Sequence, residues 1–200
     1  MPMIRETLVT TVSADGRAHI APLGLIADGD GWIVAPFAPS STLANLRAVP
    51  FCVANHVDDV RIFAGCLTGR RDWALAAAGG PVPRLAAALC HWELAVETVS
   101  EHAQRPRFHC RIVAQVPHAA FPGFNRAKNA VLEGAILISR LHMLPREKVM
   151  AEIGYLEIAV QKTAGAEELE AWGWRMERVA GFYGGGESNG GSSGANIETI

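Results

Sequence analysis

The sequence has few of the residues on which disulfide-bonded and metal-binding proteins depend. It contains four cysteines in 200 residues, and no two of them form a C-x-x-C pair. In a chain of this size that pattern is typical of buried, reduced thiols. The cluster of His102, His109 and Cys110 lacks a helical i, i+4 pair and a second ligand pair at a familiar spacing, so we predict no metal site.

Long apolar runs and basic blocks are also missing. The longest apolar stretches, such as residues 130–138, contain charges and fall short of the roughly 20 residues that a membrane span needs. No long apolar core follows the first charged residues, so we expect no signal peptide, no membrane partner and a cytoplasmic protein. The net charge of −2 without a basic cluster argues against nucleic acid as a partner.

Local signatures of several large enzyme classes are absent as well. The sequence contains no G-x-S-x-G, no G-x-x-x-x-G-K-[ST] and no H-E-x-x-H segment. The usual hydrolase, P-loop and metalloprotease mechanisms therefore have no candidate residues. What is present is 50% hydrophobic residues, enough for one sizeable core or for one core with a small appendage.

The first half of the chain is rich in strand patterns. Its first three apolar segments are separated by Ala14-Asp15-Gly16 and Asp28-Gly29-Asp30-Gly31, which are hairpin signals. We therefore expect an antiparallel meander, then a short helix, another hairpin and two long strands, which together predict a mainly β fold with a barrel. The expected strands are residues 6–12, 17–26, 32–37, 51–57, 60–67, 93–100 and 107–116.

The later part of the chain changes to helical spacing. Residues 70–89 are rich in alanine and are interrupted at Gly79-Gly80-Pro81-Val82-Pro83, which predicts two short helical pieces around a break. Apolar residues at helical spacing then predict a helical hairpin plus one helix, which are residues 125–141, 145–163 and 166–179.

These patterns predict a division of the chain into three parts. The strands and the alanine-rich segment form a barrel domain over residues 1–123, and the later helices form a helical subdomain over residues 124–182. The Gly/Ser-rich tail of residues 183–200 cannot bury enough apolar surface to order itself, so we expect it to be flexible.

Three hydroxyl side chains stand at one helix entrance, in the segment APFAPSSTLANLR of residues 35–47. A helix start leaves backbone N–H groups unpaired and carries partial positive charge, which a capping side chain or a bound anion can satisfy. A cap needs one hydroxyl and is often reinforced by Glu or Gln at the third position, which is absent here. Because no acidic residue lies between Ser40 and Arg47, simple capping and an anion site both stay open.

The second strand and the later hairpin also carry candidate ligand contacts. The strand from His19 to Gly24 contains Pro22, which donates no ladder hydrogen bond, and it fits either a flat ligand or an edge strand with a bulge. Asn55 and Asp58 stand at a strand end, where they could hydrogen-bond a heterocycle or cap the turn locally.

The start of the first long helix is a further candidate. Asn125 is a good N-cap, and Arg126 and Lys128 place cationic side chains where the helix dipole disfavours them. Such a feature can serve a ligand, or the two residues can be solvated charges.

In order and spacing, these segments resemble the flavin-binding split β-barrel proteins, and more narrowly an FMN-binding branch found in methanogenic archaea and methylotrophic bacteria. The matching segments are ETLVTTVSADGRAHIAPLGL (6–25), PFAPSSTLANLR (36–47), CVANHVDDVRIFA (52–64) and FNRAKNAVLEGAILISRL (124–141). The resemblance implies a split barrel followed by helices, and a homodimer with FMN near the subunit interface.

The resemblance also implies which residues would contact FMN. The hydroxyls at the helix entrance would meet the phosphate, together with Asn45, so that the phosphate set is Ser40, Ser41, Thr42 and Asn45. The second strand would run along the isoalloxazine through His19, Ala21, Pro22 and Gly24. The remaining candidates lie at the ring or ribityl end or reach from the helical part, and they are Asn55, Asp58, Arg126 and Asn129.

Several functions are compatible with this reading. The leading one is an FMN-dependent oxidoreductase acting on a small molecule, which the resemblance places near tetrahydromethanopterin-linked one-carbon metabolism. The alternatives are a flavin-binding carrier or assembly protein without turnover, and a structural dimer whose barrel holds no cofactor. No acid or base commits the site to one reaction, as expected if the flavin carries the redox step.

Overall fold

The computed structural model describes residues 2–184, which form two compact units. The first unit comprises residues 2–58 and 72–121, and the second comprises residues 59–71 and 122–184. Most of the tail expected over residues 183–200 lies outside the described residues, whereas Tyr183 and Gly184 belong to the last helix.

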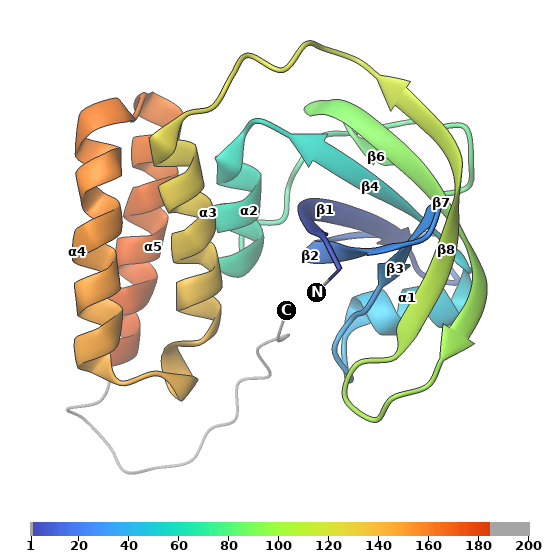
Figure 1. The fold of residues 1–200 in the computed structure, drawn as a ribbon, viewed down its shortest axis with the longest axis horizontal. Coiled ribbons are helices and arrows are strands. Elements are labelled where there is room, and N and C mark those ends of the chain that lie inside the picture. The colour runs from blue at the N-terminus through green and yellow to red at the C-terminus, as the bar shows by residue number, and fades with distance from the viewer. Residues whose placement is uncertain (1, 185–200) are drawn as a thin grey trace. The chain divides into compact units, whose positions relative to one another are not determined.

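The first unit is a closed antiparallel barrel (Figure 1). Its strand order is β1-β2-β3-β8-β7-β4, and pairing between β1 and β4 closes it. The expected meander of the first three strands and the two later long strands are confirmed. The barrel strands are β1 (Ile4–Val12), β2 (Ala18–Asp28), β3 (Gly31–Val34), β4 (Phe51–Val57), β7 (Ala88–Ser100) and β8 (Arg107–Pro117).

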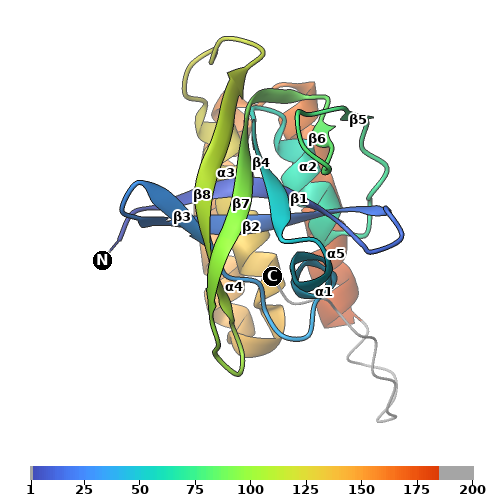
Figure 2. The same ribbon diagram turned by 90° about the vertical axis from the view of Figure 1, so that its right-hand side faces the viewer.

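Alternate side chains of these strands fill the barrel, as the period of two requires. The helix α1 (Ser41–Ala48) adds Leu46 to this core and lies beside β1 and β2 (Figure 2). The thiols of Cys52 and Cys110 are part of the core, in agreement with the expectation of buried, reduced cysteines. The other core residues are Val9, Leu23, Leu25, Trp32, Val34, Ala54, Leu94 and Phe108.

The alanine-rich segment is not helical, so that prediction was wrong. It forms a pair of two-residue strands, β5 (Leu75–Ala76) and β6 (Arg84–Leu85). Val82 is fully buried and packs with Val12 and Val53, which lie on the outer side of the barrel wall. This tertiary contact outweighs the helix propensity of the alanines.

The second unit is a helical bundle, and it contains a helix that the sequence analysis assigned as a strand. Residues Val60–Leu67 form α2, not the second strand of a hairpin. Asp59, taken as part of a turn, caps this helix by accepting a hydrogen bond from the N–H of Arg61 at 2.9 Å. An apolar run of this length can be a buried strand or a buried helix, and the cap decides between them.

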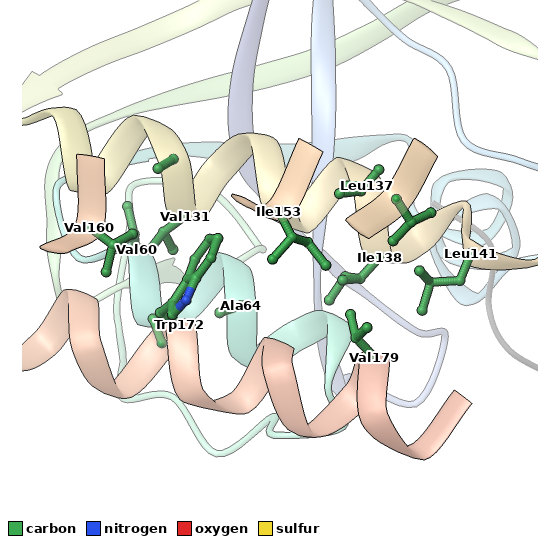
Figure 3. Close-up of a cluster of buried hydrophobic side chains, with 13 residues drawn as sticks. Val60, Ala64, Val131, Leu137, Ile138, Leu141, Ile153, Val160, Trp172 and Val179 are labelled. Carbon is green, nitrogen blue, oxygen red and sulfur yellow. The ribbon is translucent and has the colours of Figure 1, made fainter. Parts of the chain in front are cut away.

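The later helices agree with their prediction. They are α3 (Arg126–Ser139), α4 (Arg146–Thr163) and α5 (Ala166–Gly184), with a short 3₁₀ helix, η1 (Leu141–Met143), between the first two. Asn125 caps α3, and Pro145 directly precedes α4. Figure 3 shows Trp172 of α5 reaching toward Val131 of α3, with Val60 and Ala64 of α2 beside them in one apolar core.

Candidate functional site

At the entrance of α1, one of the three hydroxyl side chains caps the helix and the other two lie in its first turn. Ser40 is the N-cap, and its Oγ accepts a hydrogen bond from the N–H of Leu43 at 3.2 Å. Ser41 is half-buried and Thr42 is buried, and both lie in the first turn, which contains no acidic residue. Because one hydroxyl is enough for the cap, the other two remain the candidates for an anion.

Asn45 joins this entrance to the barrel. Its Nδ2 donates to Oγ1 of Thr11 at 3.0 Å, and both side chains are buried. Thr11 pairs with His19 across the β1–β2 ladder, and Ala21 pairs with the core residue Val9. Since cross-strand partners share a face, His19 and Ala21 belong to the inner side of the wall, and His19 lies next to the residue that anchors α1.

Pro22 and Gly24 lie on the other side of the same wall. Pro22 pairs with Leu8, and Leu8 pairs in turn with Asn55 of β4, so these residues form one row across three strands. A Cβ at Gly24 would stand 2.7 Å from Cγ2 of Ile4, so a larger residue here would require the exposed Ile4 side chain to shift. The predicted strand contacts to isoalloxazine therefore divide between two faces.

Asn55 is completely buried, and its amide is engaged by protein groups. Its Nδ2 donates to the carbonyl of Leu8 at 2.8 Å and to Oγ1 of Thr10 at 2.9 Å. Its Oδ1 accepts from the N–H of Leu85 at 2.7 Å, which ties β6 to the barrel. Asp58 follows β4 and is half-buried.

The candidates from the helical part belong to the second unit. Arg126 and Asn129 are exposed on α3. Asn125 holds the start of this helix by accepting from the N–H of Ala127 at 2.8 Å, and its Nδ2 donates to the carbonyl of Thr163 at 2.9 Å. Contact of Arg126 and Asn129 with FMN stays a prediction.

No sequence motif indicated a chain of titratable side chains that links His91 and Glu93 of β7 with His118, which follows β8. Nδ1 of His91 lies 2.8 Å from Nε2 of His118, and Nε2 of His91 lies 3.4 Å from Oε1 of Glu93. Glu93 also accepts from the N–H of Gly79 at 2.8 Å, which fastens the segment between β5 and β6 to β7. Desolvation and the nearby Arg84 and His91 lower the pKa of His118. Only the alternation in His91-Trp92-Glu93, which puts two polar residues on one face of a strand, could have indicated it.

The antiparallel barrel with the helix α1 after its third strand is a split-barrel fold, which the solved structure of an FMN-bound protein shares. Two family models match the chain: "Protein of unknown function (DUF447) N-terminal domain" over residues 5–119 and "Protein of unknown function (DUF447)" over residues 125–177. The chain therefore belongs to the DUF447 family. This result and the fold confirm the resemblance to flavin-binding split barrels.

Solved structures share this fold. An FMN-bound DUF447 protein from Methanosarcina mazei is 20% identical, with a TM-score of 0.76 over 89% of this chain and 96% of that chain. The flavin reductase of styrene monooxygenase from Pseudomonas putida is 14% identical, with a TM-score of 0.50 over 57% of this chain and 81% of that chain. A comparison with curated proteins found no match.

Two expected absences can be examined over residues 2–184. None of the helices in that range has the length and apolar character needed to cross a membrane. Within the same range, histidine, cysteine and acidic side chains form no group of three suited to hold a metal ion.

Proposed function

We propose that this protein binds FMN and that the entrance of α1 holds the phosphate. The observation that carries the proposal is the division of roles at this entrance: Ser40 caps the helix, while Ser41 and Thr42 add hydroxyls to a first turn without acidic residues. Backbone N–H groups and hydroxyls at a helix start suit a phosphate. The FMN-bound family member from Methanosarcina mazei supports the choice of this anion.

The bound flavin would supply electron transfer, so that the protein acts as an oxidoreductase on a small molecule. The role of this chain's residues is to hold the flavin and shape its surroundings. Asn45, through Thr11, would fix α1 against the barrel, and His19 would border the same region. On the family resemblance alone, the proposal extends to a cytoplasmic enzyme near tetrahydromethanopterin-linked one-carbon metabolism.

A flavin carrier or assembly protein without turnover is the second candidate function. It is favoured by Asn55, a predicted flavin contact whose amide is already engaged by Leu8, Thr10 and Leu85. A side chain used in this way builds the barrel, and its hydrogen-bonding groups are not available to a substrate.

The first test is an FMN titration of the purified protein, followed by flavin fluorescence. We expect quenching with saturation at one FMN per chain and a yellow protein after removal of free flavin. A colourless protein that leaves flavin fluorescence unchanged would rule out both functions. For the FMN-loaded protein, anaerobic mixing with NADH or NADPH then separates the two, because bleaching of the flavin absorbance within seconds supports the oxidoreductase.

The proposal includes a homodimer with the flavin near the subunit interface, which rests on the family resemblance. Light scattering coupled to size-exclusion chromatography measures the mass directly, and 21.4 kDa per chain gives a clear distinction between one and two copies. We expect twice the chain mass, and a monomer at micromolar concentration would contradict this part of the proposal.

A further inference from the structure

A pocket of about 590 Å³ lies beside the turn that joins β7 to β8. Its volume is in the range of small-molecule sites. Ile26 of β2 and Ala35, which directly follows β3, provide an apolar wall. The polar part comes from the turn and the first residue of β8, and its residues are His102, Gln104, Arg105 and Arg107. The lining thus contains two arginines and a histidine but no acidic residue.

Several contacts hold the turn in place. Nε and Nη2 of Arg105 donate to the carbonyl of Ala35 at 3.1 and 2.8 Å, and its guanidinium carbon lies 4.3 Å from the ring centroid of Phe37. The carbonyl of Gln104 accepts from the N–H of Ala38 at 2.9 Å. The positive charge of Arg105 is therefore fixed at the wall of the pocket before any ligand arrives, which lowers the entropy cost of binding.

Among the residues that line the pocket, Arg107 has a hydrogen-bond donor without an acceptor in the described part of the chain. Its Nε is buried and finds no hydrogen-bond partner among residues 2–184. A buried donor without a partner lowers stability, and a charged one lowers it more. Because Nε is out of reach of solvent, a ligand in the pocket would meet the terminal nitrogens of the same guanidinium, which are not among the buried atoms.

Three carboxylates on β2, on β7 and in the turn after β7 form ion pairs with other basic side chains. Glu101 pairs with Arg47 at 2.8 Å, Asp28 with His109 at 2.7 Å, and Glu97 with Arg111 at 3.3 Å. No ion pair within the described range includes Arg107. Arg107 therefore keeps its positive charge at the pocket without an ion-pair partner among residues 2–184.

We propose that this pocket binds a small organic anion, whose carboxylate or phosphate oxygen accepts from Arg107 and whose apolar body lies against Ile26 and Ala35. Planar guanidinium groups favour such oxygens because they can donate two parallel hydrogen bonds. None of the lining residues belongs to the α1 entrance, although the segment that follows Ala35 leads into that entrance. A role of this anion as the substrate of a bound flavin would rest on the proposed function, whereas the binding itself does not.

The test compares benzoate with benzamide, which has nearly the same shape without the charge. In ¹H–¹⁵N NMR spectra of the full chain, we expect benzoate to shift the amide signals of residues 102–107 in a saturable way, and benzamide to shift them at least about tenfold more weakly. Equal binding of the two probes, or shifts elsewhere only, would overturn the proposal without any variant.

Variants then assign the contact. We expect Arg107→Gln to weaken benzoate binding about tenfold and Arg107→Lys to weaken it less, because lysine keeps the charge but loses the planar fork. Arg111→Gln is the matched control on the same strand, where the arginine pairs with Glu97, and it should leave the affinity unchanged. Unchanged benzoate affinity in Arg107→Gln would contradict the assignment.

An FMN titration distinguishes a small organic anion from the phosphate of FMN as the ligand of this pocket. If the pocket is separate from the cofactor site, Arg107→Gln binds FMN as tightly as the unmodified protein does. A tenfold loss of FMN affinity in this variant would instead make the pocket part of the FMN phosphate site and would overturn the proposal. Benzoate binding by a protein that takes up no FMN would leave this inference standing while the proposed function fails.

Discussion

At the scale of single residues, Arg175 of α5 combines full burial with a positive charge. Its Nη1 lies 3.5 Å from the carbonyl of Ala130, while Nε and Nη2 have no partner among residues 2–184. Burial lowers the pKa of this guanidinium to about 9, because the charged form is poorly solvated. Gly134 leaves the space for it, since a Cβ there would stand 2.8 Å from Nη1.

We predict that Arg175→Met stabilises the protein. Methionine keeps the long unbranched stem and removes an uncompensated charge, so the free energy of unfolding in urea should rise by roughly 1–4 kcal/mol. Arg178→Met on the same helix is the control, and it should change stability by less than about 0.5 kcal/mol. A loss of stability in Arg175→Met alone would show that the guanidinium has a favourable partner after all.

His56 gives the barrel a dependence on pH. It contacts the ring of Trp92 edge-on at 4.4 Å, and its buried Nε2 has no partner within residues 2–184. Burial, with a smaller effect of the positive charge of Arg5, lowers its pKa to about 4 from the ordinary 6.5. The folded state therefore holds His56 neutral, while the unfolded chain takes up a proton below pH 6.5, so stability is lost as the pH falls from 6.5 toward 4.

This effect can be isolated with His56→Phe, which keeps an aromatic ring against Trp92. We expect the unmodified protein to lose roughly 1–2 kcal/mol more than the variant between pH 7.5 and pH 4.5, after allowance for partial exposure. Urea unfolding at both pH values measures this difference, in which the titration of all other groups cancels. Parallel pH profiles of the two proteins would mean that His56 is protonated equally in the folded and unfolded states.

At the scale of elements, substitutions at the entrance of α1 separate helix capping from anion binding. Ser40→Ala removes the acceptor of the Leu43 N–H and should lower the free energy of unfolding of the apo-protein by about 1 kcal/mol. Ser41→Ala combined with Thr42→Val removes two hydroxyls and keeps the volume of Thr42, so it should weaken FMN binding about tenfold or more. Fluorescence titration and urea unfolding of both variants measure the two effects. The reverse pattern would assign the phosphate to Ser40.

Elements were predictable where a local signal and the tertiary environment agree. The strands at residues 6–12 and 107–116 and the helix after Asn125 follow from period and capping, and the structure contains them. The prediction of a strand at Val60–Leu67 failed because its apolar run fits a strand as well as a helix. Asp59, which directly precedes it, was interpreted as part of a turn instead of a helix cap. The prediction of helical pieces around Val82 failed because the burial of this residue against the barrel wall has no local signature in the sequence.

The candidate site was predictable in part for the same reason. The entrance of α1 stands out because its hydroxyls and missing acidic residues are contiguous in sequence. Pro22 and Asn55 were found as unusual residues, but only the register places them in one row with Leu8 between them. Arg107 escaped notice because the burial of its Nε without a partner depends on the tertiary surroundings, which no single segment reveals.

At the scale of the whole molecule, the chain crosses between its two units more often than a linear division suggests. The barrel unit is interrupted by residues 59–71, which contain α2 and belong to the helical unit. Arg61 strengthens this assignment by pairing with Asp59 at 2.8 Å and with Glu167 of α5 at 2.9 Å. α2 is therefore flanked in sequence by β4 and β5 of the first unit but packs in the apolar core of the second.

Hydrogen exchange with and without FMN tests whether both units take part in binding. A ligand that binds only the folded state stabilises it and so slows the exchange of the amides near the binding site. At a ligand concentration of 100 times the Kd, this stabilisation is about 2.7 kcal/mol. If Ser41 and Thr42 meet the phosphate, amides of residues 40–46 gain protection. If Arg126 and Asn129 also reach the flavin, amides of residues 126–132 gain protection too, whereas those in the middle of α4 should change least.

We predict protection at both places, measured by mass spectrometry of peptides from the FMN-saturated protein. Protection at residues 40–46 alone would remove Arg126 and Asn129 from the site and would restrict the cofactor to the barrel unit. Protection at neither place, despite tight binding, would move the phosphate away from α1. Arg126→Gln provides the matched check, because its effect on FMN affinity should appear only if the α3 amides respond, and the exposure of this side chain makes the substitution harmless to folding.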